Sequence, residues 1–381
     1  MIHTSICTRN DASNRYNLTE PRKKLSRLSV NVIVYIILIQ TVASFTAHYS
    51  IKRKSYIYTN LHSQKFEQEE NKNTLLQLEH LPRLTVVLPA YNEEDRLEET
   101  IVTYRSYLAN SKLWGRDGGK FSSLLVVDDG STDGTCDVVS RQKNIKPVGV
   151  GANELNDGYK GILLNCISLI ENEGKGAAIG AAIENLSKQI VDDQKGCLDV
   201  DKNGWVILIA DADGSGNIKC LDRMVYELAT MLTSTYSRKN DISESSLLSP
   251  LPYTLWNYPA IVVGDRGFKG TSPLRAVTRW GFRTTVQLFC GGLSVKDTQC
   301  GFKVMTLTAG KNLYANLNLK SWTHDVEVLY RAKEMNLPVS SSLIEWQDKE
   351  VSFHTDVRAF IFGFLSCFFT LILRSFLFSI D

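Results

Sequence analysis

The chain has 381 residues, of which 43% are hydrophobic, and this length suits one large α/β core with small additions at its ends. Lys and Arg total 43 against 41 Asp and Glu, so the charge balance lacks the basic excess typical of nucleic-acid-binding proteins, and we expect no nucleic-acid partner. The eight cysteines form no CxxC pair, which argues against a disulfide framework or a zinc site and favours a reducing compartment.

The N-terminal part of the chain contains one uncharged apolar stretch. Residues 28–47 read LSVNVIVYIILIQTVASFTA, about the ~20 residues that a helix needs to cross a hydrocarbon core. The stretch begins late and lacks a clear small-x-small cleavage site, which disfavours a signal peptide. We therefore predict an N-terminal tail at 1–27, a transmembrane helix at 28–49 and a polar stalk at 50–81.

The C-terminal end is also apolar. Residues 360–380 read FIFGFLSCFFTLILRSFLFSI, with Arg374 near the end and Arg358 just before the stretch. This pattern fits a second span or a helix lying in the membrane interface with its arginines reaching the headgroups, and a buried core helix is the alternative. We predict a membrane-associated helix within residues 356–381 and the lipid bilayer as a partner.

Between these ends, short apolar runs alternate with helical patterns. The predicted strands are 84–88, 124–127, 205–210 and 260–263, the first of them stopped by Pro89. Predicted helices follow the first run at 93–109 and the second from about residue 134. This alternation predicts an α/β domain over residues 82–350, with a mostly parallel sheet flanked by helices. Two stretches, 144–172 and 236–258, have no obvious motif and are interpreted as insertions, the second as a mobile loop.

Carboxylates follow the later strands. Asp128 and Asp129 end the second run, Asp211 and Asp213 follow the third, and Asp265 follows the fourth. One such Asp is usually a turn or helix cap, but ligands of parallel sheets bind at the carboxyl ends of strands, so the repeated placement indicates a ligand site. The spacing of Asp211 and Asp213 suits Mg²⁺ or Mn²⁺, with coordination positions left for a diphosphate.

Two glycines flank Lys175 in a stretch that is neither a P-loop nor a complete GxGxxG motif. We interpret it as a helix start with a lysine above an anion. A Rossmann dinucleotide site is disfavoured, because no glycines follow the first strand. Residues 199–204 copy half of an EF-hand loop, but Ala210 stands where the bidentate Glu belongs, so we interpret them as a turn.

Four stretches together resemble, in order, the motifs of family 2 inverting glycosyltransferases of the GT-A fold: LPAYNEE at 88–94, VVDDGS at 126–131, GKGAA at 174–178 and DADG at 211–214. DTQCGFK at 297–303 and WTHDVEVLY at 322–330 resemble dolichyl-phosphate β-glucosyltransferases more than dolichyl-phosphate mannose synthases. The resemblance implies a GT-A nucleotide-diphospho-sugar transferase domain.

The resemblance also implies roles for single residues. Those implied for the donor are Pro89, Tyr91, Glu93 and Asp128 or Asp129 around the uridine, Lys175 near the nucleotide, and Asp211 and Asp213 at Mg²⁺ or Mn²⁺. Those implied for the acceptor are Arg266 and Arg275 at the phosphate, with Asp297 and Asp325 as contacts to sugar hydroxyls, as structural residues or, less favoured, as a base. The pattern departs from the family at 171–173, where a basic residue is common, at Asp265, where Ser is common, and at His324, where an aromatic residue is expected.

The implied reaction is transfer of glucose from UDP-glucose to dolichyl phosphate with inversion, for assembly of the N-glycan precursor. The implied location is the endoplasmic reticulum membrane, with the catalytic domain facing the cytosol, where nucleotide sugars are made. A mannose synthase or another polyprenyl-phosphate glycosyltransferase is the first alternative, because glucose and mannose differ at one hydroxyl. An inactive membrane-tethered scaffold is the second, and the intact acidic motifs disfavour it.

Overall fold

The computed structural model describes residues 81–115, 119, 121–144, 162–196, 204–240, 253–267, 286, 293–321 and 323–347. Both predicted membrane segments, residues 50–80 of the stalk and Arg275 lie outside the described residues. Among the helices that are described, none combines the length and the apolar character needed to cross a membrane.

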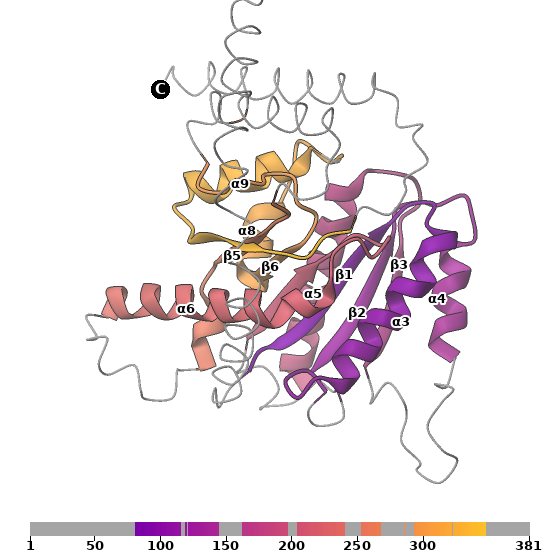
Figure 1. The fold of residues 1–381 in the computed structure, drawn as a ribbon, viewed down its shortest axis with the longest axis horizontal. Coiled ribbons are helices and arrows are strands. Elements are labelled where there is room, and N and C mark those ends of the chain that lie inside the picture. Colours follow the sequence, from indigo (N-terminus) through magenta and orange to yellow (C-terminus); the bar gives the residue numbers. More distant parts are fainter. Residues whose placement is uncertain are drawn as a thin grey trace, which may run out of the picture. The chain divides into compact units, whose positions relative to one another are not determined.

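A seven-stranded sheet in the order β3-β2-β1-β4-β6-β5-β7 forms the centre of the described part (Figure 1). Its strands are β1 (Arg83–Ala90), β2 (Ser122–Asp128), β3 (Leu163–Ser168), β4 (Trp205–Ile209), β5 (Ile261–Asp265), β6 (Lys303–Thr306) and β7 (Val339–Leu343). β6 pairs antiparallel with both β4 and β5, and the other neighbours pair in parallel. The prediction of a mostly parallel sheet is confirmed.

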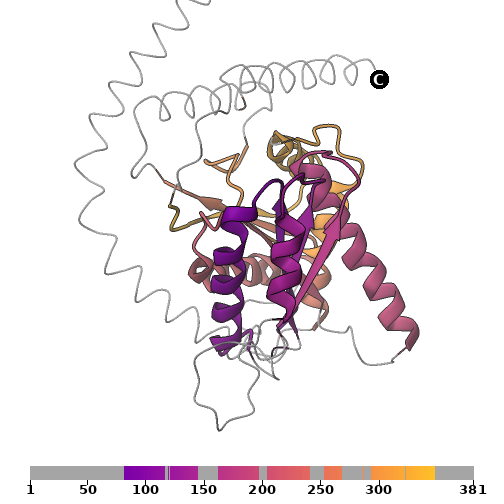
Figure 2. The ribbon, with the colours of Figure 1, turned by 90° about the vertical axis from the view of Figure 1, so that its right-hand side faces the viewer.

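Helices cover both faces of this sheet (Figures 1 and 2). They are α3 (Glu94–Asn110), α4 (Thr135–Asn144), α5 (Lys175–Gly196), α6 (Leu221–Asn240), α8 (Leu307–Tyr314) and α9 (His324–Glu334), with short 3₁₀ helices η2 (Ile218–Cys220) and η4 (Tyr253–Asn257). α3, α4 and α6 pack on one face, whereas α5, α8 and α9 pack on the other. This is a GT-A-like α/β arrangement.

The central strands are buried along nearly their whole length, because helices cover both of their faces. Val86 of β1, Val126 of β2, Leu208 of β4 and Val262 of β5 are fully inaccessible to solvent. Strands buried on both faces are expected to be continuous apolar runs, which is how these four were recognised in the sequence.

β1 continues through Pro89 to Ala90, so the expectation that Pro89 stops this strand is wrong. The carbonyl of Val87 accepts the N–H of Ala210 at the β4 side, and the alternation of a strand points the nitrogen of Pro89 to that same side. β4 has already ended there, at Ile209. The missing proline N–H therefore breaks no bond of the sheet.

The interpretation of residues 144–172 and 236–258 as insertions is partly wrong. β3 lies within residues 144–172 and pairs in parallel with β2 as an edge strand. Its sequence, LLNCIS, has exposed residues at its first, third and last positions and lacks the continuous apolar character of the central strands. In the second stretch, residues 236–240 complete α6 and η4 begins at Tyr253.

Candidate active site

The carboxylates that follow the parallel strands meet at one edge of the sheet. β1 and β2 are in register, so Ala90 lies beside Asp128, and Asp211 follows β4 on the other side of β1. β5 runs parallel to β4, because both pair antiparallel with β6, and it ends at Asp265. The sheet order thus brings together strand ends that are far apart in the sequence.

The turns after β1 and β2 are hydrogen-bonded to each other. The N–H of Asn92 donates to Ser131 Oγ at 2.9 Å, and Asn92 Oδ1 accepts the N–H of Thr132, also at 2.9 Å. Asn92 has a φ of 53°, a left-handed conformation that Asn tolerates better than most residues. The turn leaves Tyr91 45% exposed, which gives this edge an accessible aromatic ring.

The buried carboxylate of Asp128 is held by two donors. Oδ1 accepts the N–H of Ser131 at 3.0 Å, and Oδ2 accepts the thiol of Cys136 at 2.9 Å. The sulfur of Cys136 also lies 3.1 Å from Ser168 Oγ. Burial and the bond to Asp128 raise the pKa of the Cys136 thiol to about 12, so the thiol remains a protonated donor at neutral pH.

Asp129 points to a different partner. Its carboxylate accepts the backbone N–H groups of Glu173 and Gly174, at 2.9 and 2.8 Å, and is 3% exposed. Burial raises its pKa, although the two N–H groups oppose that shift. Of the two adjacent aspartates, Asp129 therefore holds the glycine-rich loop in place.

The glycine-rich loop is packed tightly against the segment that precedes α9. Gly174 has a φ of 99°, and a Cβ there would lie 2.7 Å from the carbonyl oxygen of Lys320. A Cβ on Gly176 would lie 2.7 Å from Cβ of His324, and the N–H of Gly176 donates to the Lys320 carbonyl at 2.6 Å. The backbone on both sides of Lys175 is therefore fixed, and both glycines are required.

Lys175 forms an ion pair with Asp211, the first aspartate after β4. Burial lowers the pKa of Lys175, but Asp211, Asp325 and Asp213 outweigh this effect and raise it, so the side chain is a cation. Asp213 Oδ1 accepts the N–H of Ser215 at 2.9 Å. A Cβ at Gly301 would lie 2.5 Å from both carboxylate oxygens of Asp211, so that position has no room for a side chain.

Glu93 lies near the same acidic pair. Burial raises its pKa to about 7, with Arg96 opposing the shift and the charges of Asp213 and Asp211 adding to it. Its carboxylate pairs with Arg96 at 2.8 Å, and its N–H donates to Thr135 Oγ1 at 2.9 Å. The raised pKa of Glu93 therefore comes mainly from burial, and the two aspartates add to it.

The residues after β4 fit a divalent cation of the Mg²⁺ or Mn²⁺ type. Asp211 and Asp213 supply hard oxygen ligands, and Asp211 already attracts a cation, the ammonium of Lys175. Within the described ranges, no three His, Cys, Asp or Glu side chains cluster closely enough to hold a metal ion. The protein ligands in this part would thus be the two aspartates, and a diphosphate would add oxygens of its own.

Arg266 lies beyond β5 and is bound to Asp297. Its Nε and Nη2 donate to Oδ2 and Oδ1 of Asp297 at 2.7 and 2.8 Å, and Nη2 also reaches the carbonyl of Gln299 at 3.3 Å. Its guanidinium carbon lies 5.2 Å from the ring centre of Trp346, a cation–π contact. An acceptor phosphate at Arg266 would have to share this guanidinium with Asp297.

Asp325 begins α9 and is buried between two basic side chains. Its Oδ1 lies 2.7 Å from Lys303 Nζ and 2.9 Å from His324 Nε2. Burial alone would raise the pKa of Asp325, but His324 and Lys303 hold it well below its usual range. The ring centre of His324 lies 5.9 Å from that of Tyr314. Such a carboxylate is a weak base.

Sequence reasoning missed four residues of this site: Cys136, Gly301, Lys303 and Trp346. Gly301 and Lys303 lie in the stretch DTQCGFK at 297–303, and a lysine inside the apolar run FKVM, at 302–305, was a further signal, since a buried Lys requires a partner. Cys136 and Trp346 act through tertiary contacts that their neighbours in the sequence do not reveal.

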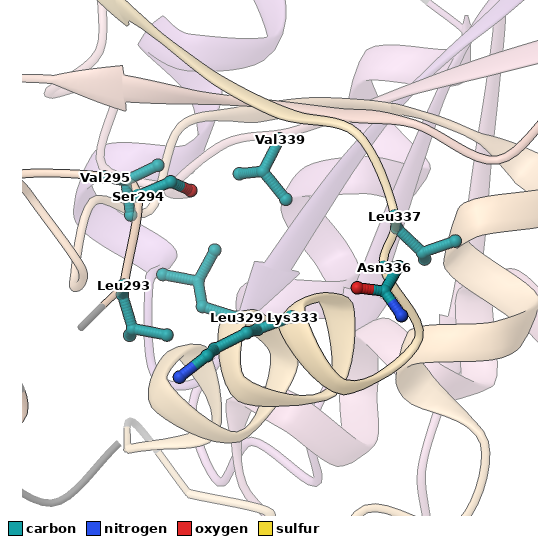
Figure 3. Close-up of a pocket in the computed structure, with 8 residues that line it drawn as sticks. All are labelled: Leu293, Ser294, Val295, Leu329, Lys333, Asn336, Leu337 and Val339. Atoms are coloured by element: carbon teal, nitrogen blue, oxygen red, sulfur yellow. The ribbon is translucent and has the colours of Figure 1, made fainter. Parts of the chain in front are cut away.

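A separate cavity of about 350 Å³ lies between α9 and the start of β7 (Figure 3). Its lining residues are Leu293, Ser294, Val295, Leu329, Lys333, Asn336, Leu337 and Val339. Val339 pairs with Ile261 at the amino ends of β7 and β5, away from the edge that carries the aspartates. None of the predicted site residues lines this cavity.

The mostly parallel sheet, its helical layers and the acidic pair after β4 fit the GT-A-like class of glycosyltransferases. The chain belongs to glycosyl transferase family 2, whose profile matches residues 85–286.

Curated relatives agree with this assignment. A dolichyl-phosphate beta-glucosyltransferase of Homo sapiens is 30% identical over 278 residues, which are 71% of this chain and 69% of that protein. The protein of the same name from Dictyostelium discoideum is 28% identical over 285 residues, 73% of this chain and 69% of that protein.

The solved structure of glucosyl-3-phosphoglycerate synthase from Mycobacterium tuberculosis with Mn²⁺, UDP-glucose and glycerol 3-phosphate aligns with a TM-score of 0.42 and 14% identity, covering 80% of this chain and 83% of that one.

Proposed function

We propose that this glycosyltransferase transfers glucose from UDP-glucose to dolichyl phosphate with inversion, giving dolichyl β-D-glucosyl phosphate. The names of its curated relatives, at up to 30% identity over about 70% of the chain, are the observation that carries the proposal. The described geometry supports it, since Tyr91, Asp128 and the acidic pair lie at or just after the carboxyl ends of β1, β2 and β4, and Lys175 pairs with Asp211.

The donor would bind along the turns after β1, β2 and β4. Asp128 would accept a hydrogen bond from the uracil, and Tyr91 would offer its exposed ring to the base. Asp211 and Asp213 would hold Mg²⁺ or Mn²⁺, which neutralises charge on a leaving diphosphate. Asp129 would contribute indirectly, by fixing the loop that carries Lys175.

The acceptor phosphate would need positioning more than deprotonation. The second ionisation of a phosphomonoester lies near pH ~6, so its attacking oxygen is already anionic at neutral pH. Asp325, with its lowered pKa, and Asp297, with both oxygens bonded to Arg266, are poorly suited to act as a base. Arg266 would hold the phosphate in line with the anomeric carbon, and Arg275 is a second candidate.

The purified full-length chain should be given dolichyl phosphate, Mn²⁺ and either UDP-glucose or GDP-mannose. We expect a lipid-linked glucose that a β-glucosidase releases, and no comparable product from GDP-mannose. Preferential transfer of mannose would replace the glucosyl assignment with the mannose synthase alternative. Failure to bind either nucleotide sugar in the presence of Mn²⁺ would favour the inactive scaffold.

The proposal includes a location on the endoplasmic reticulum membrane with the catalytic domain in the cytosol. It rests on the apolar stretches at 28–47 and 360–380 and on the absence of CxxC pairs. Protease added to sealed microsomes should then degrade the domain, and protection of the domain would overturn this orientation. Asn17 begins the sequence Asn-Leu-Thr, which matches the N-glycosylation acceptor pattern, so a glycan on Asn17 would support a lumenal N-terminus.

A further inference from the structure

The ion pair between Lys175 and Asp211 occupies a place that two ligands of the proposed reaction would both need. The ammonium lies on Oδ1 of Asp211, where a divalent cation would bind, and the same lysine begins α5, where a diphosphate would bind. Both side chains remain partly accessible, 27% for Lys175 and 24% for Asp211, so ligands can reach them.

We propose that Lys175 acts as the resident counter-ion of Asp211 and moves to the diphosphate when the donor binds, so that divalent metal and nucleotide bind cooperatively. This inference rests on the proposed function, because it takes a nucleoside diphosphate as the ligand. It adds a coupling between two binding events that the bare acidic motif does not imply.

The surroundings of Lys175 fix its backbone, so only the side chain can move. Gly174 and Gly176 have no space for a Cβ against Lys320 and His324, and Asp129 holds the loop through two backbone N–H groups. Because the backbone is fixed, the Lys175 ammonium can bind only acceptors within reach of its own side chain. In the free protein the acceptor is Asp211, and when the donor is bound the diphosphate oxygens compete for it.

The charges explain why the two ligands need each other. A divalent cation entering alone at Asp211 meets the positive charge of Lys175 and must displace it from its carboxylate. A diphosphate entering alone brings two or more negative charges close to Asp211 and Asp213. When both enter, the diphosphate takes the ammonium and the metal takes the carboxylates, which removes both repulsions. Such coupling is reciprocal and typically amounts to about 5–150-fold in affinity.

The test is a pair of titrations on the full-length chain. Mn²⁺ binding without nucleotide would be followed by the loss of the electron paramagnetic resonance signal of free Mn²⁺, and UDP binding by calorimetry. We expect Lys175→Met to bind Mn²⁺ alone about tenfold more tightly than the wild type and to bind UDP about tenfold more weakly. A lysine with a purely structural role would weaken both.

Three further variants control this result. Lys188→Met removes an exposed lysine from the same helix, one that pairs with Glu184 at 2.7 Å, and should behave as the wild type. Lys175→Arg keeps the charge and should keep weak binding of Mn²⁺ alone. Lys175→Gln provides a polar, uncharged variant in case Lys175→Met does not fold, and the opposite changes in Mn²⁺ and UDP affinity are expected for it too.

The possible failures are distinguishable. If the wild type binds Mn²⁺ and UDP but neither Lys175→Met nor Lys175→Gln binds Mn²⁺ more tightly than the wild type, the counter-ion proposal is overturned and the proposed function stands. If the wild type does not bind UDP with or without Mn²⁺, both the proposed function and this inference are wrong.

Discussion

The two halves of the site differ in how much backbone groups and side chains contribute to holding the carboxylates. In the donor half, the turns after β1, β2 and β4, backbone N–H groups hold Asp128, Asp129 and Asp213, and the side-chain partners are the Cys136 thiol on Asp128 and Lys175 on Asp211. In the acceptor half, around the ends of β5 and β7 and the start of α9, cationic side chains hold Asp297 and Asp325. A backbone donor survives any substitution except proline, whereas a single change can remove a side-chain donor. The acceptor half is therefore the more fragile of the two.

The largest expected effect comes from the donor half, at Asp213. Asp213→Asn removes one of two hard oxygen ligands, and we expect transfer to fall by roughly 10²–10³-fold, the size usual for losing one electrostatic contact to a developing charge. The circular dichroism spectrum and the melting temperature should stay close to those of the wild type. Asp137→Asn, an exposed change on α4, is the control. Full activity of Asp213→Asn, or of the wild type in excess chelator, would contradict this prediction.

The next effect tests the fragility of the acceptor half. Lys303→Met leaves Asp325 buried without its lysine partner, and breaking a buried pair in this way costs about 3–5 kcal/mol of unfolding free energy at neutral pH. The loss should be measurable by urea denaturation. Lys311→Met, on the adjacent helix α8 and exposed, should change stability by less than about 0.5 kcal/mol. A similarly small loss of stability for Lys303→Met would contradict the greater fragility of the acceptor half.

The contribution of the Lys303–Asp325 pair to the unfolding free energy should depend on pH. Because the folded pKa of Asp325 lies below its unfolded value, its contribution to stability is present above about pH 4 and is lost as pH falls further. Lys303→Met removes one cause of the low pKa. The stability difference between wild type and variant should therefore shrink as pH falls below about 4, and a constant difference down to pH 2 would contradict the assignment.

A smaller effect is expected for Arg266. Arg266→Ala should raise the KM for dolichyl phosphate and lower kcat, together about 10–100-fold in kcat/KM, since a hydrogen bond to a charged group is worth ~1.5–3 kcal/mol. The affinity for UDP-glucose should hardly change. Arg266→Lys keeps the charge but loses the two-pronged contact with Asp297, so it should recover part of the loss. A loss of UDP-glucose affinity equal to the loss in kcat/KM would place Arg266 in the donor half instead.

The smallest effect concerns Cys136, the one side-chain donor found on Asp128 among the described residues. Cys136→Ala should raise the KM for UDP-glucose about threefold to tenfold, as expected for one hydrogen bond of ~1 kcal/mol, and leave kcat nearly unchanged. Cys136→Ser keeps a donor and should restore the KM. If Cys136→Ser were as impaired as Cys136→Ala, the thiol would not be orienting Asp128 through this bond.

The contrast between the halves also explains what the sequence could and could not reveal. Val126 to Asp128 and Ile207 to Asp211 place a carboxylate directly after an apolar run, so a local pattern was enough to find these strands and aspartates. Arg266 and Asp297 are separated by 31 residues, and no local pattern predicts that their side chains pair. β7, with the sequence VSSSL, and β3, at the edge of the sheet, lack continuous apolar character and were missed as strands.

Gly301 links the two halves. It belongs to the segment that Arg266 holds through Asp297 and Gln299, yet its missing side chain leaves the space that Asp211 occupies. This contact matters for any chimera that combines the donor half of one relative with the acceptor half of another. A chimera joined between β4 and β6 inherits an aspartate from one parent and the glycine beneath it from another, so residues 211 and 301 should be transplanted together.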